Sequence, residues 1–228
     1  MRLQALPPAG TGIASEFQPA RLLGLIAAVA FTILGVVFAT APAEAQIDDN
    51  PQTFWGVEGI DPDTTTNVQS EVWAIEQVGN TIYVGGKFLQ VTGNGSHDQP
   101  YLAAFHADTG RWIDWWRPAL DGPVYALQAS PDGKLFVGGE FTSINGQNAP
   151  AFAAIDPTTG NIVPGFTARV SGGAPAVVRD FDLEGDSLYV GGNFTTAANQ
   201  GVQVPRQRAA KFDWSTGAVD PDLSLIHI

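Results

Sequence analysis

The feature that most constrains this chain is a seven-residue stretch that occurs three times. Each copy places three strand-favouring residues before two adjacent glycines and ends in phenylalanine. The copies are IYVGGKF, LFVGGEF and LYVGGNF, which begin at Ile82, Leu135 and Leu188. Glycine weakens the interior of a strand, so a glycine pair in this setting needs a structural cause. We expect close backbone packing or a β-bulge at the end of the strand.

Two further landmarks accompany each copy in the same order. A segment led by valine precedes the glycines, and an apolar residue, three variable residues and Thr-Gly follow them. The first glycines of the pairs lie at 85, 138 and 191, a spacing of 53 residues (138 − 85 and 191 − 138). Three landmarks in one order identify a repeat protein. The residues assigned to the repeat framework are Gly85, Gly86, Phe88, Thr109, Gly110, Gly138, Gly139, Phe141, Thr159, Gly160, Gly191, Gly192, Phe194, Thr216 and Gly217.

Each repeat predicts four short strands. The valine-led segment forms the first, and the apolar run before the glycines forms the second, as expected of a strand that is buried on both faces. A polar loop leads to the third strand, and the Thr-Gly turn leads to the fourth. The fourth strands are expected in Trp112 to Trp116, in Ile162 to Phe166 and from Val219 onward. Four strands in a unit of this length are typical of a β-propeller blade, so we predict an all-β propeller with blades at 72–123, 124–177 and 178–222.

The repeat pattern resembles two known types. An apolar triplet followed by Gly-Gly resembles the kelch repeat. The fuller pattern, Val-Gly-Gly-x-Phe, a polar loop and an apolar residue with x-x-x-Thr-Gly, resembles the delta-60 type repeats of bacterial secreted β-propellers. Phe88, Phe141 and Phe194 depart from the aromatic spacing of kelch, so the bacterial group is the closer match. The resemblance spans residues 72–222 and implies the fold, because the function of that group is uncharacterised.

Residues 1–45 predict a signal peptide. Arg2 and Arg21 precede the apolar run Leu22 to Ala39, and Ala43-Glu44-Ala45 predicts cleavage after Ala45. An uncleaved membrane anchor is the alternative, because about 18 apolar residues is the lower limit for spanning a bilayer. Under either interpretation the repeats are exported, to the medium or to the cell surface, and the membrane is contacted only through an uncleaved N-terminal segment.

The sequence also predicts a fragment of a larger ring. Three blades are fewer than the roughly four to eight of known propellers. Ile60-Asp61-Pro62-Asp63, within the segment 46–71, resembles Val219-Asp220-Pro221-Asp222 and is a candidate for a ring-closing outer strand. The last six residues, LSLIHI at 223–228, resemble the translation of a sequencing adapter and are predicted to be non-native. An ordinary apolar strand end is the alternative for them.

Composition excludes several classes of function. A net charge of -12 with 11 Lys and Arg argues against a nucleic-acid partner. The chain has no cysteine, and so no disulfide and no site like the copper centre with a modified Cys in galactose-oxidase-like kelch enzymes. His97, His106 and His227 are too scattered to predict a metal site. The run Asp61 to Asn67 alternates oxygen ligands like a calcium loop but lacks its glycine and its final acid, so we interpret it as a solvated turn.

No catalytic residue and no cofactor are predicted. Asp108, Asp156 and Asp213, near the Thr-Gly turns, are expected to accept hydrogen bonds from backbone N–H groups. In the stretch RWIDWW, alternation places Trp112, Asp114 and Trp116 on one face of the strand and Trp115 on the other, so at least one indole is a candidate for exposure and for stacking on a sugar ring. Packing between blades is the role that we favour for these tryptophans, because large aromatic residues commonly fill cores and interfaces.

The loops after the three phenylalanines vary in length and carry polar tips, and such loops on a rigid scaffold often carry binding specificity. The candidate binding residues are Trp112, Trp115, Asn94, His97, Asn145, Arg206 and Arg208. Our first hypothesis is a non-catalytic extracellular module that binds a protein or a glycan at a loop face or in the central channel. A second is a glycan hydrolase or lyase with paired carboxylates about 5 to 9 Å apart at the channel mouth. A third is a scaffold for a neighbouring domain that carries the activity.

Overall fold

A computed structural model describes residues 55–59 and 69–223. These residues form antiparallel strands and no helix, which confirms the predicted all-β class. No helix in this part of the chain is therefore long and apolar enough to cross a bilayer. The signal segment, the Ile60-Asp61-Pro62-Asp63 strand candidate, the calcium-like run and His227 lie outside the described residues.

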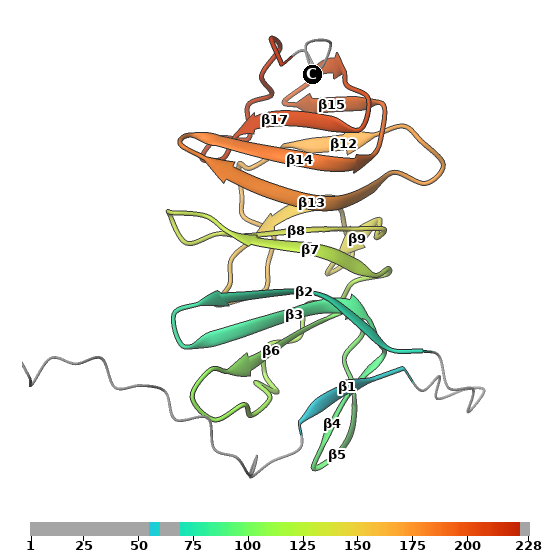
Figure 1. Cartoon of the computed structure of the whole chain (residues 1–228), viewed down its shortest axis with the longest axis vertical. Coiled ribbons are helices and arrows are strands. Elements are labelled where there is room, and N and C mark those ends of the chain that lie inside the picture. The colour runs from blue at the N-terminus through green and yellow to red at the C-terminus, as the bar shows by residue number, and fades with distance from the viewer. Residues whose placement is uncertain (1–54, 60–68, 224–228) are drawn as a thin grey trace, which may run out of the picture. The chain divides into compact units, whose positions relative to one another are not determined.

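Three larger sheets hold the three repeats, and each has the Gly-Gly strand in its centre. We call them blades 1, 2 and 3, and Figure 1 shows them stacked in chain order. Blade 1 contains β2 (Glu71–Val78), β3 (Thr81–Lys87) and β6 (Leu102–His106). Blade 2 contains β7 (Val124–Ala129), β8 (Leu135–Gly139) and β11 (Phe152–Ile155). Blade 3 contains β13 (Val177–Glu184), β14 (Ser187–Asn193) and β17 (Ala209–Asp213).

The predicted fourth strand is reduced to one bridge pair in each blade. These pairs are Phe105 with Trp112, Ile155 with Ile162 and Phe212 with Val219. In blade 1 the chain then reverses, because the Trp116 N–H donates to the Ile113 carbonyl. In blade 2, Val163 is followed by Pro164, which has no N–H to give to a ladder, and by Gly165 at a φ of 88°. The fourth strand is therefore shorter than predicted.

The polar loops expected after the phenylalanines are β-hairpins, which corrects the sequence interpretation. They are β4 (Gln90–Gly93) with β5 (Gly95–Asp98), β9 (Ser143–Ile144) with β10 (Gln147–Asn148), and β15 (Thr196–Asn199) with β16 (Val202–Pro205). Each hairpin pairs with the segment that precedes its own blade. That segment is β1 (Gly56–Glu58) for blade 1, a bridge from Leu120 for blade 2 and β12 (Arg169–Ser171) for blade 3. We call these small structures the rim sheets.

The two glycines of each pair have different structural causes. A Cβ on the first glycine would lie 2.5 Å from a Val124 Cγ in the case of Gly85, and equally close to a Val178 Cγ in the case of Gly138. The first glycine therefore admits a valine from the next blade. A Cβ on the second would lie well under 3.0 Å from a backbone carbonyl of the first strand, as for Gly192 against Val177. The second glycine therefore permits close backbone packing.

A β-bulge accompanies each second glycine. The register shifts between Val72 and Ala74 in β2, and at the equivalent positions of β7 and β13. Both predicted causes of the glycine pair, a bulge and close backbone packing, are thus present, although the bulge lies in the neighbouring strand. Apolar side chains fill the space between blades 1 and 2 and between blades 2 and 3, with Phe141 and Phe194 fully buried.

The carboxylate of Asp121 fixes the rim hairpin of blade 2. It accepts hydrogen bonds from the N–H groups of Thr142 (2.7 Å) and Ser143 (2.9 Å) and from both of their hydroxyl groups. Partial burial acts to raise the pKa of Asp121, but these hydrogen bonds outweigh it and lower the pKa to about 2. The ionised carboxylate therefore favours the folded state.

The glycine pair predicts unequal effects on stability for the same substitution at adjacent positions. Gly192→Ala forces a Cβ against the Val177 carbonyl and is expected to lower the free energy of unfolding by about 1 to 3 kcal/mol. At Gly191 the nearest atom to a new Cβ is the Asp180 carbonyl oxygen at 4.0 Å, so Gly191→Ala is the matched control and should change stability by under about 1 kcal/mol. Urea unfolding of dilute protein measures both, and equal losses would contradict this account.

The low pKa of Asp121 predicts a stability difference that depends on pH. A carboxylate whose pKa falls from about 3.9 in the unfolded chain stabilises the fold above pH 4, and this contribution disappears as the pH falls through 2. Asp121→Asn should lower the free energy of unfolding by about 1 kcal/mol at pH 7, and its melting curve should converge on that of the wild type near pH 2. Asp186→Asn, on an exposed turn, is the control and should match the wild type throughout.

Candidate functional site

A hollow of about 390 Å³ lies beside blade 1 and its rim sheet. It brings together four of the seven predicted binding residues, namely Asn94, His97, Trp112 and Trp115. The other lining residues are Trp55, His106, Arg111, Ile113 and Asp114. The hollow therefore combines aromatic rings with neutral and charged polar groups, which is the usual composition of a small-molecule site.

An aromatic stack forms one wall of the hollow. The ring centroids of His97 and Trp112 are 4.8 Å apart, and Trp55 lies 6.0 Å from Trp112 and 6.2 Å from His97. The Arg117 guanidinium lies 4.7 Å from the centroid of the Trp112 ring. Only 7% of Trp112 is exposed, and its indole Nε1 has no hydrogen-bond partner among the described residues. Trp112 therefore acts as a packed support for the hollow, but it packs within blade 1 and its rim sheet and not between blades, which is the role that the sequence favoured for it.

Local pairing positions this stack. Trp112 forms the single bridge to Phe105, and His97 lies opposite Val91 in the β4–β5 hairpin. Gly93 in β4 has no side chain, and a Cβ there would lie 2.5 Å from the Trp55 ring. Glycine at this position lets the Trp55 indole lie against the hairpin.

Trp115 is the exposed indole of the site, with 67% of its surface accessible. It lines this hollow and also a second one of about 280 Å³, whose walls include Tyr83, Trp116 and Pro157. Trp115 thus separates a more polar hollow from a more apolar one. Of the three tryptophans in the RWIDWW stretch, Trp115 is the exposed one. The alternation predicted Trp112 and Trp116 on one face, but they pack into different clusters because the chain turns between them.

The remaining three candidates are not among the residues that line this hollow, and each makes hydrogen bonds that hold the backbone. Asn145, at a φ of 52°, accepts a hydrogen bond from the Ala119 N–H and donates one to the Gly160 carbonyl (3.0 Å). Arg206 donates to the carbonyl of Asp220 (3.1 Å) and to that of Pro221. Arg208, at a φ of 67°, accepts a backbone hydrogen bond from Gly192.

Two of the three aspartates near the Thr-Gly turns accept the predicted backbone hydrogen bonds, and the third does not. Asp213 accepts hydrogen bonds from the N–H groups of Ser215 (3.0 Å) and Thr216 (2.7 Å), and Asp156 accepts the equivalent pair. The hydrogen bond from the Ser215 hydroxyl is the main cause that lowers the pKa of Asp213. Within the described residues no hydrogen bond reaches the Asp108 side chain, because the residue that aligns with Asp156 and Asp213 is His106.

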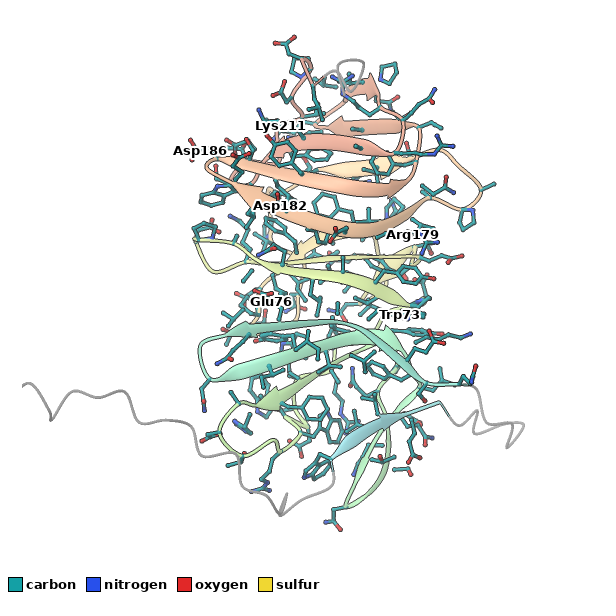
Figure 2. All side chains as sticks on the ribbon, viewed as in Figure 1. Trp73, Glu76, Arg179, Asp182, Asp186 and Lys211 are labelled. Atoms are coloured by element: carbon teal, nitrogen blue, oxygen red, sulfur yellow. The ribbon has the colours of Figure 1, made fainter. Side chains whose placement is uncertain are left out.

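The sequence interpretation missed a row of side chains across the three first strands. Trp73, Tyr125 and Arg179 are the bulged residues of β2, β7 and β13. The Trp73 and Tyr125 rings stack with centroids 4.7 Å apart, and the Arg179 guanidinium lies 5.0 Å from the Tyr125 centroid. Figure 2 shows Trp73 and Arg179 at the same end of their strands. Each of the three residues directly follows the landmark valine of its repeat, and this shared position is the sequence signal from which the row could have been predicted.

Comparison with known proteins supports the repeat assignment. A family model described as a domain of unknown function (DUF5122) β-propeller matches residues 130–158, which include the Gly-Gly strand of blade 2. The fold is a β-propeller. The search of curated proteins found no match.

Two solved structures are similar to this propeller chain. The computationally designed Ika4 protein is 15% identical, with 69% of this chain and 75% of that chain covered and a TM-score of 0.41. The computationally designed Ika8 protein is 14% identical, with 72% of this chain and 64% of that chain covered and a TM-score of 0.30.

Trp112 and Trp115, two of the three tryptophans that line the hollow, predict different costs for one substitution. Trp112→Ala removes a buried ring from the stack and should lower the free energy of unfolding by about 3 kcal/mol or more. Trp115→Ala removes an exposed ring and should change it by under about 0.5 kcal/mol. Chemical unfolding of the two variants measures the difference, and a Trp115→Ala loss as large as that of Trp112→Ala would show that Trp115 is a packing residue.

Proposed function

We propose that this propeller is a non-catalytic binding module that takes a glycan at the Trp115 site. The observation that carries the proposal is the exposed Trp115 indole, which stands between two hollows. The carbon-bound hydrogens on the face of a sugar ring pack well on a flat indole, while its hydroxyl groups need hydrogen-bond partners. An extended glycan could contact the indole with one ring and place its neighbours in the two hollows.

Polar groups around the larger hollow suit sugar hydroxyls. Asn94 offers both a donor and an acceptor, Arg111 offers only donors, and Asp114 offers acceptors. These three side chains come from the rim hairpin turn and from the segment around the Trp112 bridge, so they reach the hollow from two directions. The arrangement favours a ligand with several hydroxyl groups over a purely apolar one.

The alternative of a glycan hydrolase or lyase is less well supported at this hollow. Hydrolysis by the usual mechanism needs two carboxyl groups about 5 to 9 Å apart. Among the described residues that line the larger hollow, Asp114 supplies the one carboxylate, and the described walls of the smaller hollow hold none. Binding without bond cleavage is therefore the function that we favour.

We further propose that the repeats are exported and belong to the delta-60 type of bacterial secreted propeller. The apolar segment and the Ala-Glu-Ala site within residues 1–45 support export. The recurring Val-Gly-Gly-x-Phe pattern and the family match at 130–158 support the repeat type. An extracellular location fits a glycan ligand, because polysaccharides are abundant outside cells.

Affinity electrophoresis in gels that contain soluble polysaccharides tests the proposal. The probes are a neutral β-glucan, a xylan and a polygalacturonate. We expect at least one of them to retard the wild-type protein and to retard Trp115→Ala at least about tenfold less, since a lost stacking contact of about 1.4 kcal/mol weakens binding tenfold. Trp73→Ala removes the exposed indole of β2 and is the matched control, which should be retarded like the wild type.

Three results would overturn the proposal. Equal retardation of wild type and Trp115→Ala would exclude this indole as the contact, and no retardation by any of the three probes would argue against a glycan ligand. Release of new reducing ends from a retarding polysaccharide, lost in Asp114→Asn, would favour the hydrolase instead.

A further inference from the structure

The contact between blades 1 and 2 rests on three features of blade 1. Gly85 receives the Val124 side chain of blade 2. The Tyr83 hydroxyl donates a hydrogen bond of 2.8 Å to the Pro157 carbonyl, and Glu76 accepts one of 3.2 Å from the Ala129 N–H. A glycine, a tyrosine and a carboxylate on one blade thus meet a valine and two backbone groups on the next.

On its other face, blade 1 carries the residues that correspond to the valine side of this interface, and no described residue covers them. Val72 is 42% exposed, whereas the equivalent Val124 and Val178 are 0% exposed. Ile75 is 66% exposed, although its counterparts in the other two blades, Leu127 and Phe181, are 9% and 8% exposed. The difference has a simple cause, because a neighbouring blade covers the equivalent positions in blades 2 and 3.

Blade 3 carries the residues that correspond to the glycine side of the interface, on the face that points away from blade 2. A Cβ on Gly191 would find the Asp180 carbonyl oxygen at 4.0 Å and no closer described atom, whereas a valine fills this space at Gly85 and Gly138. Tyr189 stands two residues before Gly191 as Tyr83 does before Gly85, and Asp182 pairs with Tyr189 as Glu76 pairs with Tyr83. Figure 2 shows Glu76 and Asp182 on their two blades.

At one pair of positions on this face, blade 3 carries charged residues where blade 2, whose face is covered by a neighbouring blade, carries apolar ones. Lys211 and Asp220 form an ion pair of 2.9 Å, with side chains 29% and 28% exposed. Ala154 and Val163 occupy these positions in blade 2, with the same backbone hydrogen bond between them. The charged pair covers part of an otherwise apolar surface, so a contact on this face should be weaker than the contacts inside the chain.

We propose that the Val72 face of this chain binds the Gly191 face of a second copy, head to tail. Val72 of one copy would enter the space over Gly191 of the other, and the hydroxyl of Tyr189 and the carboxylate of Asp182 would meet backbone groups of blade 1. The same contact, a valine of one blade against the first glycine of the other, already occurs twice within the chain, at Gly85 and at Gly138. Such a contact is heterologous, because a different face of each copy takes part in it.

Sedimentation velocity of the purified chain at roughly 1 to 100 µM tests the proposal. We expect self-association that Val72→Asp weakens about tenfold or more, because it places a charge in an apolar contact. Val202→Asp is the matched control, since Val202 is 59% exposed on the rim sheet of blade 3 and should leave association unchanged. Gly191→Val fills the receiving space and should also abolish association, with melting of the monomer unchanged.

Mixing the two deficient variants distinguishes head-to-tail pairing from other modes. Val72→Asp retains its Gly191 face, and Gly191→Val retains its Val72 face, so an equimolar mixture should form a 1:1 complex that neither variant forms alone. The double variant Lys211→Ala with Asp220→Val, which copies blade 2, should associate more tightly than the wild type.

Three outcomes would overturn the proposal. These are a wild type that stays monomeric at 100 µM, a Gly191→Val variant that still associates when Val72→Asp does not, and a mixture that forms no complex. The second would indicate that two Val72 faces pair with each other. Trp112, one wall of the glycan hollow, lies on the same face of blade 1 as Val72, because its counterparts Ile162 and Val219 pack against the clusters between blades. Polysaccharide retardation is therefore also measured on the monomeric Gly191→Val variant, which keeps Trp115 and the hollow unaltered, so that failure of assembly and failure of glycan binding are separate results.

Discussion

The contact between a backbone carbonyl and a glycine that has no Cβ governs the rest of this structure. Where the first strand bulges, the carbonyl before its landmark valine comes so close to the second glycine that a side chain there could not fit. The bulge then directs the valine toward the first glycine of the preceding blade. One pair of glycines therefore sets both the pairing within a blade and the stacking between blades.

The blades were predictable from the sequence because each Gly-Gly strand is apolar on both faces and recurs, with its landmarks, at one constant spacing. The rim hairpins were not predictable in this way. Their strands are short and mostly polar, so they carry no hydrophobic alternation, although the turn at Asn145-Gly146, with both φ values positive, is a known hairpin signal.

The candidate site was predictable only in part. Trp112, Trp115, Asn94 and His97 stood out as aromatic or polar residues at loop positions, and the hollow contains all four. Trp55 lies in a segment with no repeat landmark, and the pairing of β1 with β4 brings it there. Asn145 and Arg208 have positive φ values that a sequence does not display, and their roles follow from backbone geometry.

The bulges have a consequence for how such repeats diversify. A bulged residue has no partner across the ladder, so the strand geometry does not select its side chain, and tryptophan, tyrosine and arginine occupy the same place in the three blades. Duplication or exchange of whole repeats would therefore rearrange this row of side chains while leaving the buried contacts intact. The glycine pair thus keeps the backbone of the three blades alike, and the bulge beside it leaves one side-chain position in each blade that can vary.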